Sequence, residues 1–156
     1  MKIILTVLIC LCVPLMGADK KPLTKEESAK VIEAAIRKAA KKPTGELTKV
    51  DYEKVTTLYL GGNQLTDVKG LEKLIKLKDL HLDDNNLTNM PKGLENLTQL
   101  QELNLLDNKL TDVKGLEKLT QLMRLYLLNN PDLTKAQIAE LKKALPKCGI
   151  YSNPTK

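Results

Sequence analysis

The residues Leu100-Gln-Glu-Leu103-Asn-Leu105-Leu-Asp-Asn108-Lys-Leu110 carry a pattern that recurs along the chain. The same order of apolar residues and one asparagine begins again at Val55, Leu77 and Leu122. These four copies start 22, 23 and 22 residues apart, and self-similarity at such a period indicates a solenoid of stacked units. A degenerate fifth copy starts at Leu145, 23 residues after Leu122.

Each copy predicts one strand and one return segment. The Leu-x-Leu triplet alternates apolar and variable residues, which is typical of a strand with one buried face. The leucines at 71, 74 and 77 recur every third residue, a spacing that suits a short 3₁₀ turn. The amides of the asparagines at 63, 85, 108 and 130 are expected to satisfy backbone groups that the turn leaves unpaired inside the stack.

The pattern resembles the leucine-rich repeat family, whose units read Leu-x-x-Leu-x-Leu-x-x-Asn-x-Leu. The resemblance implies an α/β fold: a right-handed horseshoe solenoid with parallel strands on its concave face. It also implies a non-enzymatic binding module. The segments outside the repeats predict a helical cap at the N-terminal end and a helix followed by a strand as the cap at the C-terminal end.

Three segments divide the chain. Residues 1–18 combine a lysine, an apolar run and small residues before Ala18, which indicates a secretory signal peptide. Residues 19–54 are predicted to be a linker and the N-terminal cap, and residues 55–156 the repeats with their C-terminal cap. The apolar run is too short for a comfortable membrane span. We therefore expect a secreted or periplasmic protein without stable membrane insertion after signal removal.

Two helices are predicted before the repeats and one near the end. Thr24-Lys-Glu-Glu27 reads as a capping box, and the helix after it should run to about Lys41. A second, shorter helix should start at Thr48, and a third at Thr134. The first helix has two interpretations: a cap over the apolar end of the solenoid, or a basic amphipathic helix lying on a membrane.

The fifth copy determines how the one cysteine outside the signal segment is interpreted. Aligning Leu145 with Leu122 puts Cys148 and Ile150 in the two inward positions. Cys148 is then expected to be a buried thiol in a leucine-sized slot. An intermolecular or reactive thiol is the alternative.

Composition argues against several functions. The formal net charge of +6 comes with lysines spread over the return segments, and no basic surface interleaved with aromatic residues is indicated, so no nucleic-acid partner is expected. His81 has no cysteine or serine partner at a recognisable spacing, and no phosphate-binding loop or zinc signature occurs. We expect no catalytic residue, no cofactor and no metal.

The outward strand positions are the candidates for partner binding, because the apolar core does not dictate them. Five acidic residues gather there, which favours a basic protein or peptide; calcium and a merely hydrated surface are the alternatives. The alignment also places Leu106, Leu128 and Tyr151 in one outward column beside Tyr126, and contiguous apolar residues suggest a contact. The predicted partner-binding residues are Tyr59, Asp79, His81, Asp83, Asp84, Glu102, Asn104, Leu106, Asp107, Arg124, Tyr126, Leu128 and Tyr151.

The sequence therefore predicts an exported module that binds a protein or peptide through its strands. An envelope structural or adhesion protein that acts by self-association is the alternative. Five strands with four outward residues each offer roughly 300 Å², well under the roughly 800 Å² per partner of a standard interface. The strands alone should hold a short peptide, or bind weakly.

Overall fold

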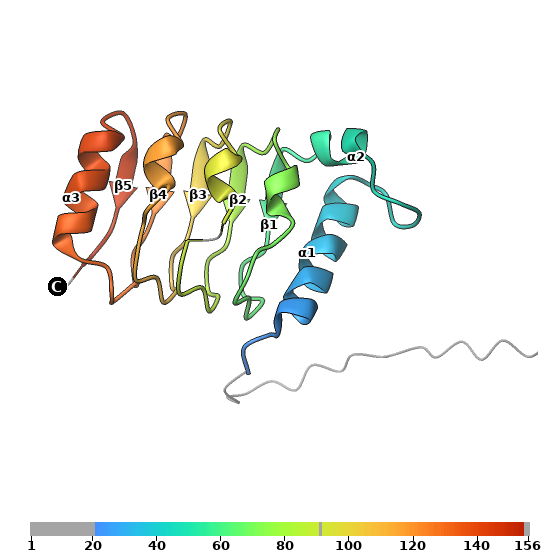
Figure 1. Cartoon of the computed structure of the whole chain (residues 1–156), viewed down its shortest axis with the longest axis horizontal. Helices are drawn as coiled ribbons and strands as arrows, with labels where there is room; N and C mark the ends of the chain where they lie inside the picture. Colours follow the sequence, from blue (N-terminus) through green and yellow to red (C-terminus); the bar gives the residue numbers. More distant parts are fainter. Residues whose placement is uncertain (1–20, 91, 155–156) are drawn as a thin grey trace, which may run out of the picture.

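The computed structural model describes residues 21–90 and 92–154. Its strands form a five-stranded parallel sheet in which spatial order follows sequence order, as Figure 1 shows. This confirms the predicted α/β solenoid. The elements in chain order are α1 (Lys25–Ala39), α2 (Lys49–Glu53), β1 (Thr57–Tyr59), η1 (Leu71–Lys73), β2 (Asp79–His81), η2 (Leu94–Asn96), β3 (Glu102–Asn104), η3 (Leu116–Lys118), β4 (Arg124–Tyr126), α3 (Lys135–Ala144) and β5 (Gly149–Tyr151).

The core is a column of leucines stacked from repeat to repeat. The central residues of the first four strands lie in register, and the last of them, Leu125, pairs with Ile150 of β5. Leucine supplies most of the core, and each of these strand leucines is at most 2% exposed. The period of the sequence places them there, because a strand turns every second side chain to the same face. Members of the central column are Leu58, Leu80, Leu103 and Leu125.

The return segments are the predicted short 3₁₀ helices. η1, η2 and η3 lie side by side along the solenoid, and α3 lies beside η3, where it replaces the 3₁₀ turn of the last repeat. Each 3₁₀ helix follows a glycine with positive φ. At Gly93 (φ 91°) a Cβ would also lie 2.8 Å from the Cβ of Glu72 in the preceding repeat. Only glycine meets both the backbone and the packing requirement there.

Buried asparagines join the repeats, as the sequence predicts. Asn85, Asn108 and Asn130 are at most 5% exposed. Each donates from Nδ2 to three carbonyl oxygens, one of them in the preceding repeat, and accepts a backbone N–H of that repeat at Oδ1. Asn63 differs because no repeat precedes it. It is half-buried and donates to Gly61 O in its own turn.

Helix α1 covers the N-terminal end of the solenoid beside β1 (Figure 1). Thr24 and Glu27 form the predicted capping box, and Thr48 and Asp51 form a second one at α2. Ile32 and Ile36 are 2% and 3% exposed and belong to the same core cluster as the leucines. The interpretation of α1 as a membrane-surface helix is therefore wrong in this structure, since its apolar face is already buried. Among the described residues, no helix is long and apolar enough to cross a membrane.

The fifth strand is two residues out of the predicted register. Gly149 pairs with Arg124 and Tyr151 with Tyr126, so the spacing to the preceding strand is 25 residues rather than 23. Ile150, not Cys148, therefore follows Leu125 in the column. Cys148 is half-buried at the edge of the core, and its Sγ lies 3.8 Å from Gly149 O. The prediction that Cys148 is a buried thiol in a leucine-sized slot was wrong, because the α3 return is longer than the 3₁₀ return.

The predicted signal peptide, residues 1–18, lies outside the described residues. The division of the chain into signal, linker with cap and repeats thus stays a prediction.

Candidate partner-binding surface

The outward side chains of β1–β5 and of the residues that follow each strand form one face, here called the strand face. All thirteen predicted partner-binding residues lie on this face or at its edge. Tyr59 and Tyr151 are 71% and 50% exposed, Asp84 and Asp107 are also exposed, and Leu106 and Leu128 are half-buried. Neither of these two leucines belongs to the core cluster, which confirms that both point away from the stack.

An aromatic row crosses the strand face. The register places Tyr59, His81, Asn104, Tyr126 and Tyr151 side by side on the five strands. The rings of Tyr59 and His81 stack with centroids 4.7 Å apart, and those of Tyr126 and Tyr151 with centroids 5.0 Å apart. The prediction put Tyr151 in the column of Leu106 and Leu128, which was wrong. The row therefore contains two stacked aromatic pairs, separated by Asn104.

Most of the acidic residues have a polar partner in a neighbouring repeat. Asp79 accepts from Thr57 Oγ1 (3.2 Å), and Asp83 accepts from Asn104 Nδ2 (3.2 Å). Glu102 accepts from Arg124 Nε at 2.7 Å, and this hydrogen bond, with the charge of Glu102, raises the pKa of the guanidinium.

Asp107 likewise accepts from Asn129 Nδ2 at 2.7 Å. Neighbouring donors relieve the repulsion that crowded carboxylates feel. The face nevertheless stays acidic, since Arg124 is the one cation among the thirteen predicted residues.

Part of this acidity has a structural origin that the sequence interpretation missed. Asp84, Asp107 and Asn129 adopt φ of 51°, 53° and 56°, and Gly62 holds the equivalent place in the first repeat with φ 70°. Gly, Asn and Asp are the residues that tolerate this left-handed conformation best. The backbone conformation therefore dictates the residue types at this position. For that reason, the acidic residues Asp84 and Asp107 are weaker evidence for a basic partner than Asp79 or Asp83. The signal was present in the sequence, because all four residues are of these types.

The apolar column has Leu106 and Leu128 as its centre. The residue that continues it in the last repeat is Asn153, which lies after β5, rather than Tyr151. Its Oδ1 accepts from Asn129 N at 2.7 Å, and its Nδ2 donates to Asn129 Oδ1 at 3.1 Å. The apolar part of the strand face is thus smaller than predicted and adjoins the Tyr126–Tyr151 pair.

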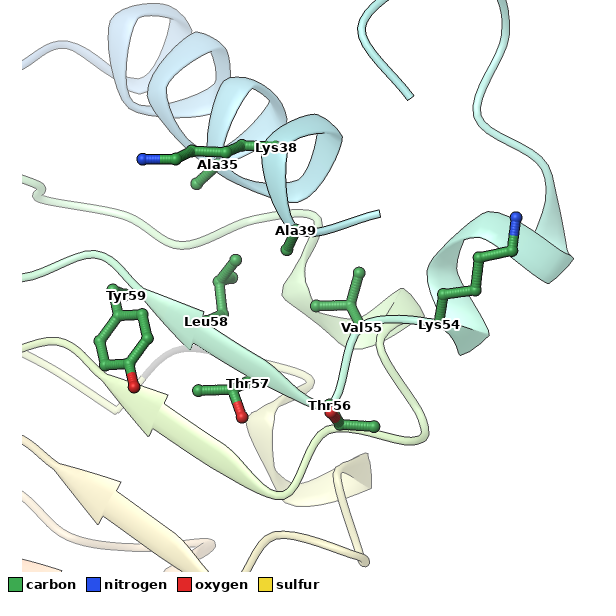
Figure 2. Close-up of a pocket in the computed structure, with 9 residues that line it drawn as sticks. All are labelled: Ala35, Lys38, Ala39, Lys54, Val55, Thr56, Thr57, Leu58 and Tyr59. Carbon is green, nitrogen blue, oxygen red and sulfur yellow. The ribbon is translucent and has the colours of Figure 1, made fainter. Parts of the chain in front are cut away.

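A separate pocket of about 420 Å³ lies between α1 and β1. Figure 2 shows Val55 and Leu58 directed toward the helix, opposite Ala35 and Ala39. Its charged side chains are two lysines, and no acid, histidine or cysteine lines it. It is the space that the cap helix leaves over the first strand.

The described residues contain no group of three or more His, Cys, Asp or Glu side chains placed to hold a metal ion. His81 is held in its stack with Tyr59. Burial raises the pKa of the Cys148 thiol, which makes it a poorer nucleophile at neutral pH. The strand face can therefore recognise a partner through its aromatic rings, its carboxylates and the two half-buried leucines, Leu106 and Leu128.

Comparison with known proteins agrees with this geometry. Residues 53–98 match the family model described as Leucine Rich repeats (2 copies). No curated protein matches the chain. Among solved structures, a leucine-rich repeat protein of Leptospira interrogans is 33% identical with a TM-score of 0.58, over 67% of this chain and 28% of that one.

Two internalins of Listeria monocytogenes have the same fold. Internalin C2 is 25% identical with a TM-score of 0.68, over 81% of this chain and 56% of its own. The internalin inlF is 24% identical with a TM-score of 0.66, over 81% of this chain and 43% of its own. The chain thus spans between 28% and 56% of the length of these proteins. Leucine-rich repeats generally mediate protein–protein interactions and are generally not enzymes.

Proposed function

Because the chain is a leucine-rich repeat protein, we propose that it is an exported, non-enzymatic module that binds a protein or peptide through its strand face. The observation that carries the proposal is the aromatic row, since four of its five side chains are rings on a surface that the core does not require to be aromatic. Aromatic side chains are enriched at the centres of protein interfaces.

Export is proposed from residues 1–18 alone, whose charged start and short apolar run have the form of a signal peptide. A secreted or periplasmic location follows from it. Fractionation with an antibody against the repeats tests this directly: the protein should be found outside the cytoplasm at a mass reduced by about the 18 residues of the signal. Full-length protein retained in the cytoplasm would contradict it.

The binding surface is tested by capture from an exported-protein fraction on immobilised protein. Leu128→Lys adds a charge to the apolar column of the strand face, while Ile75→Lys adds the same charge at an exposed residue of a return segment. We expect a captured protein to be lost with Leu128→Lys and retained with Ile75→Lys. Equal capture by both variants would show that the partner binds to a surface other than the strand face.

Self-association is the second candidate, and Leu106 and Leu128 are the observation that favours it, since two adjacent apolar side chains on an open face can be covered by a second copy. Sedimentation velocity of the wild type and of a variant with both leucines changed to lysine separates the two. A wild-type dimer that becomes a monomer favours self-association. A monomeric wild type favours a foreign partner.

A further inference from the structure

The two aromatic pairs of the row stack across the sheet. Their centroid distances, 4.7 Å and 5.0 Å, match the spacing of about 4.8 Å between neighbouring strands. Their interplanar angles are 23° and 11°, so the rings stand nearly parallel, with their faces turned along the row. His81 and Tyr126 are the members of the two pairs that lie nearest to β3, one on each side of it.

The side chain between His81 and Tyr126 in the row is that of Asn104, which lies close to the sheet. Asn104 donates from Nδ2 to Asp83 Oδ1 and accepts Leu106 N at Oδ1, at 3.2 Å and 3.1 Å. Both partners hold the amide along the strand, toward Leu106, rather than upright between the rings. His81 and Tyr126 stand two strands apart, or about 9.6 Å, and a short amide forms the floor between their faces.

We infer that the strand face binds a lysine side chain of its partner, with the ammonium group seated over Asn104 between the rings of His81 and Tyr126. The inference rests on the proposed function and names the chemistry of the partner. A nitrogen midway between the rings would lie about 4.8 Å from each centroid, inside the roughly 6 Å limit for a cation–π contact. A guanidinium stacked on one ring face at van der Waals distance would be too far from the other.

The charge around this position favours a cation. Asp79 on β2 and Asp83 just after β2 flank His81, and Glu102 lies two residues before Asn104 on β3. The positively charged residue nearby on the strand face is Arg124, and it already forms a salt bridge with Glu102. The carboxylates of Asp83 and Glu102 together with Asn104 Oδ1 offer acceptors for the three N–H donors of an ammonium group.

The remaining surroundings suit the methylene stem of lysine. Leu106 and Leu128 lie beside the row, two residues after the ends of β3 and β4, and are half-buried, so they offer an apolar contact for the four methylene groups. Within the described ranges, no cation of the protein lies over these four rings. The cation–π contact found there is that of Lys73 over Tyr52, which is away from the strand face.

The test uses three peptides that differ at one residue, acetyl-Gly-Ser-X-Ser-Gly-amide with X lysine, norleucine or arginine, titrated into the protein and followed by NMR at pH 8. The lysine peptide should shift the signals of His81, Asn104 and Tyr126, and its own ε-methylene protons should move upfield between the two rings. Norleucine has the same stem without the charge and should not bind measurably. Arginine should bind more weakly than lysine.

Matched variants separate the inner rings from the outer ones. His81→Leu and Tyr126→Leu should each weaken the lysine peptide by about two- to fivefold, the value of one exposed cation–π contact. Tyr59→Leu and Tyr151→Leu remove the outer ring of each pair and should change the affinity less than either inner substitution. Unchanged thermal midpoints show that the variants are folded.

Equal binding of the lysine and norleucine peptides, equal effects of inner and outer substitutions, or shifts confined to other parts of the molecule would each overturn the inference. These outcomes leave the proposed function standing, because a captured partner could still depend on Leu128. Conversely, a captured partner that tolerates Leu128→Lys contradicts the proposed function whatever the peptides do.

Discussion

Asn108 donates a hydrogen bond of 2.9 Å from its Nδ2 to the carbonyl oxygen of Leu82, in the preceding repeat. The same amide nitrogen bonds to two carbonyls of its own turn, and its Oδ1 accepts Leu87 N at 3.1 Å. One side chain therefore satisfies four backbone groups at the junction of two repeats. Because the side chain is 4% exposed, water cannot easily replace it.

Asn108→Ala is expected to lower the free energy of unfolding by about 3 kcal/mol, because it leaves buried backbone groups unpaired. Urea titration followed by circular dichroism measures the change. Asn63→Ala is the matched control: Asn63 is half-buried and its side chain donates to Gly61 O, so the substitution should cost less than about 1 kcal/mol. Equal losses from the two substitutions would contradict the role assigned to burial.

Asp107 should be replaceable by Asn or Gly but not by a β-branched residue. Its φ of 53° lies in the left-handed region, which costs a residue with a branched Cβ about 1–2 kcal/mol. Asp107→Val should therefore destabilise the protein by about that amount, and Asp107→Asn by less than about 0.5 kcal/mol. If Asp107→Val unfolds at the wild-type midpoint, the backbone does not determine the residue type here.

Asp51 should make stability depend on acid pH. Hydrogen bonds from the backbone and side chain of Thr48, then from Lys54 and Lys42, hold the pKa of its carboxyl far below the usual range. A depressed folded-state pKa contributes stability above the unfolded value of about 3.9 and loses it as the pH falls toward the folded value.

Wild type should thus be more stable than Asp51→Asn at pH 7, and the difference should shrink between about pH 5 and pH 2. Denaturant midpoints across this range provide the measurement. Glu46→Gln, which removes an exposed carboxyl in the loop before α2, is the control for the loss of one negative charge. A constant difference between wild type and Asp51→Asn would show that the charge of Asp51 is not responsible.

Cys148 should react slowly with alkylating reagents in the folded protein. Its thiol is half-buried, and burial raises its pKa, so less of the reactive thiolate is present at neutral pH. In a protein with Cys10 and Cys12 changed to Ser, iodoacetamide at pH 7.5 should label Cys148 faster in urea than in buffer. Equal rates, measured by mass spectrometry, would mean that the thiol is open to solvent in the native state.

Local sequence patterns predicted the features that depend on residues close together in the sequence, such as the starts of the helices. The capping boxes at Thr24, Thr48 and Thr134 mark the starts of α1, α2 and α3, because the side-chain hydrogen bonds involved span three residues. The buried asparagines were also predicted, since every complete repeat needs the same backbone groups satisfied. The left-handed position shared by Gly62 and Asp107 was missed, although its residue types pointed to it.

The register of β5 was not predictable in the same way. It depends on how α3 packs beside η3, and a helix takes up a different number of residues from the 3₁₀ turn that it replaces. A shift of two residues keeps the inward and outward faces, so Ile150 still points inward. It changes which outward residues are neighbours, and for that reason Tyr151 stacks on Tyr126 instead of joining Leu128.

The amino-acid sequence alone determined the solenoid, its caps and the division of each strand into inward and outward residues. It could do so because a strand with one buried face needs an apolar residue at every second position, and this alternation is visible in the sequence. Tertiary structure decided which outward residues meet. Contacts such as Tyr59 with His81, or Asn104 with Asp83, cross between strands more than 20 residues apart, and they exist only once the strands have been brought about 4.8 Å from one another. The arrangement of the candidate binding surface is a property of that packing.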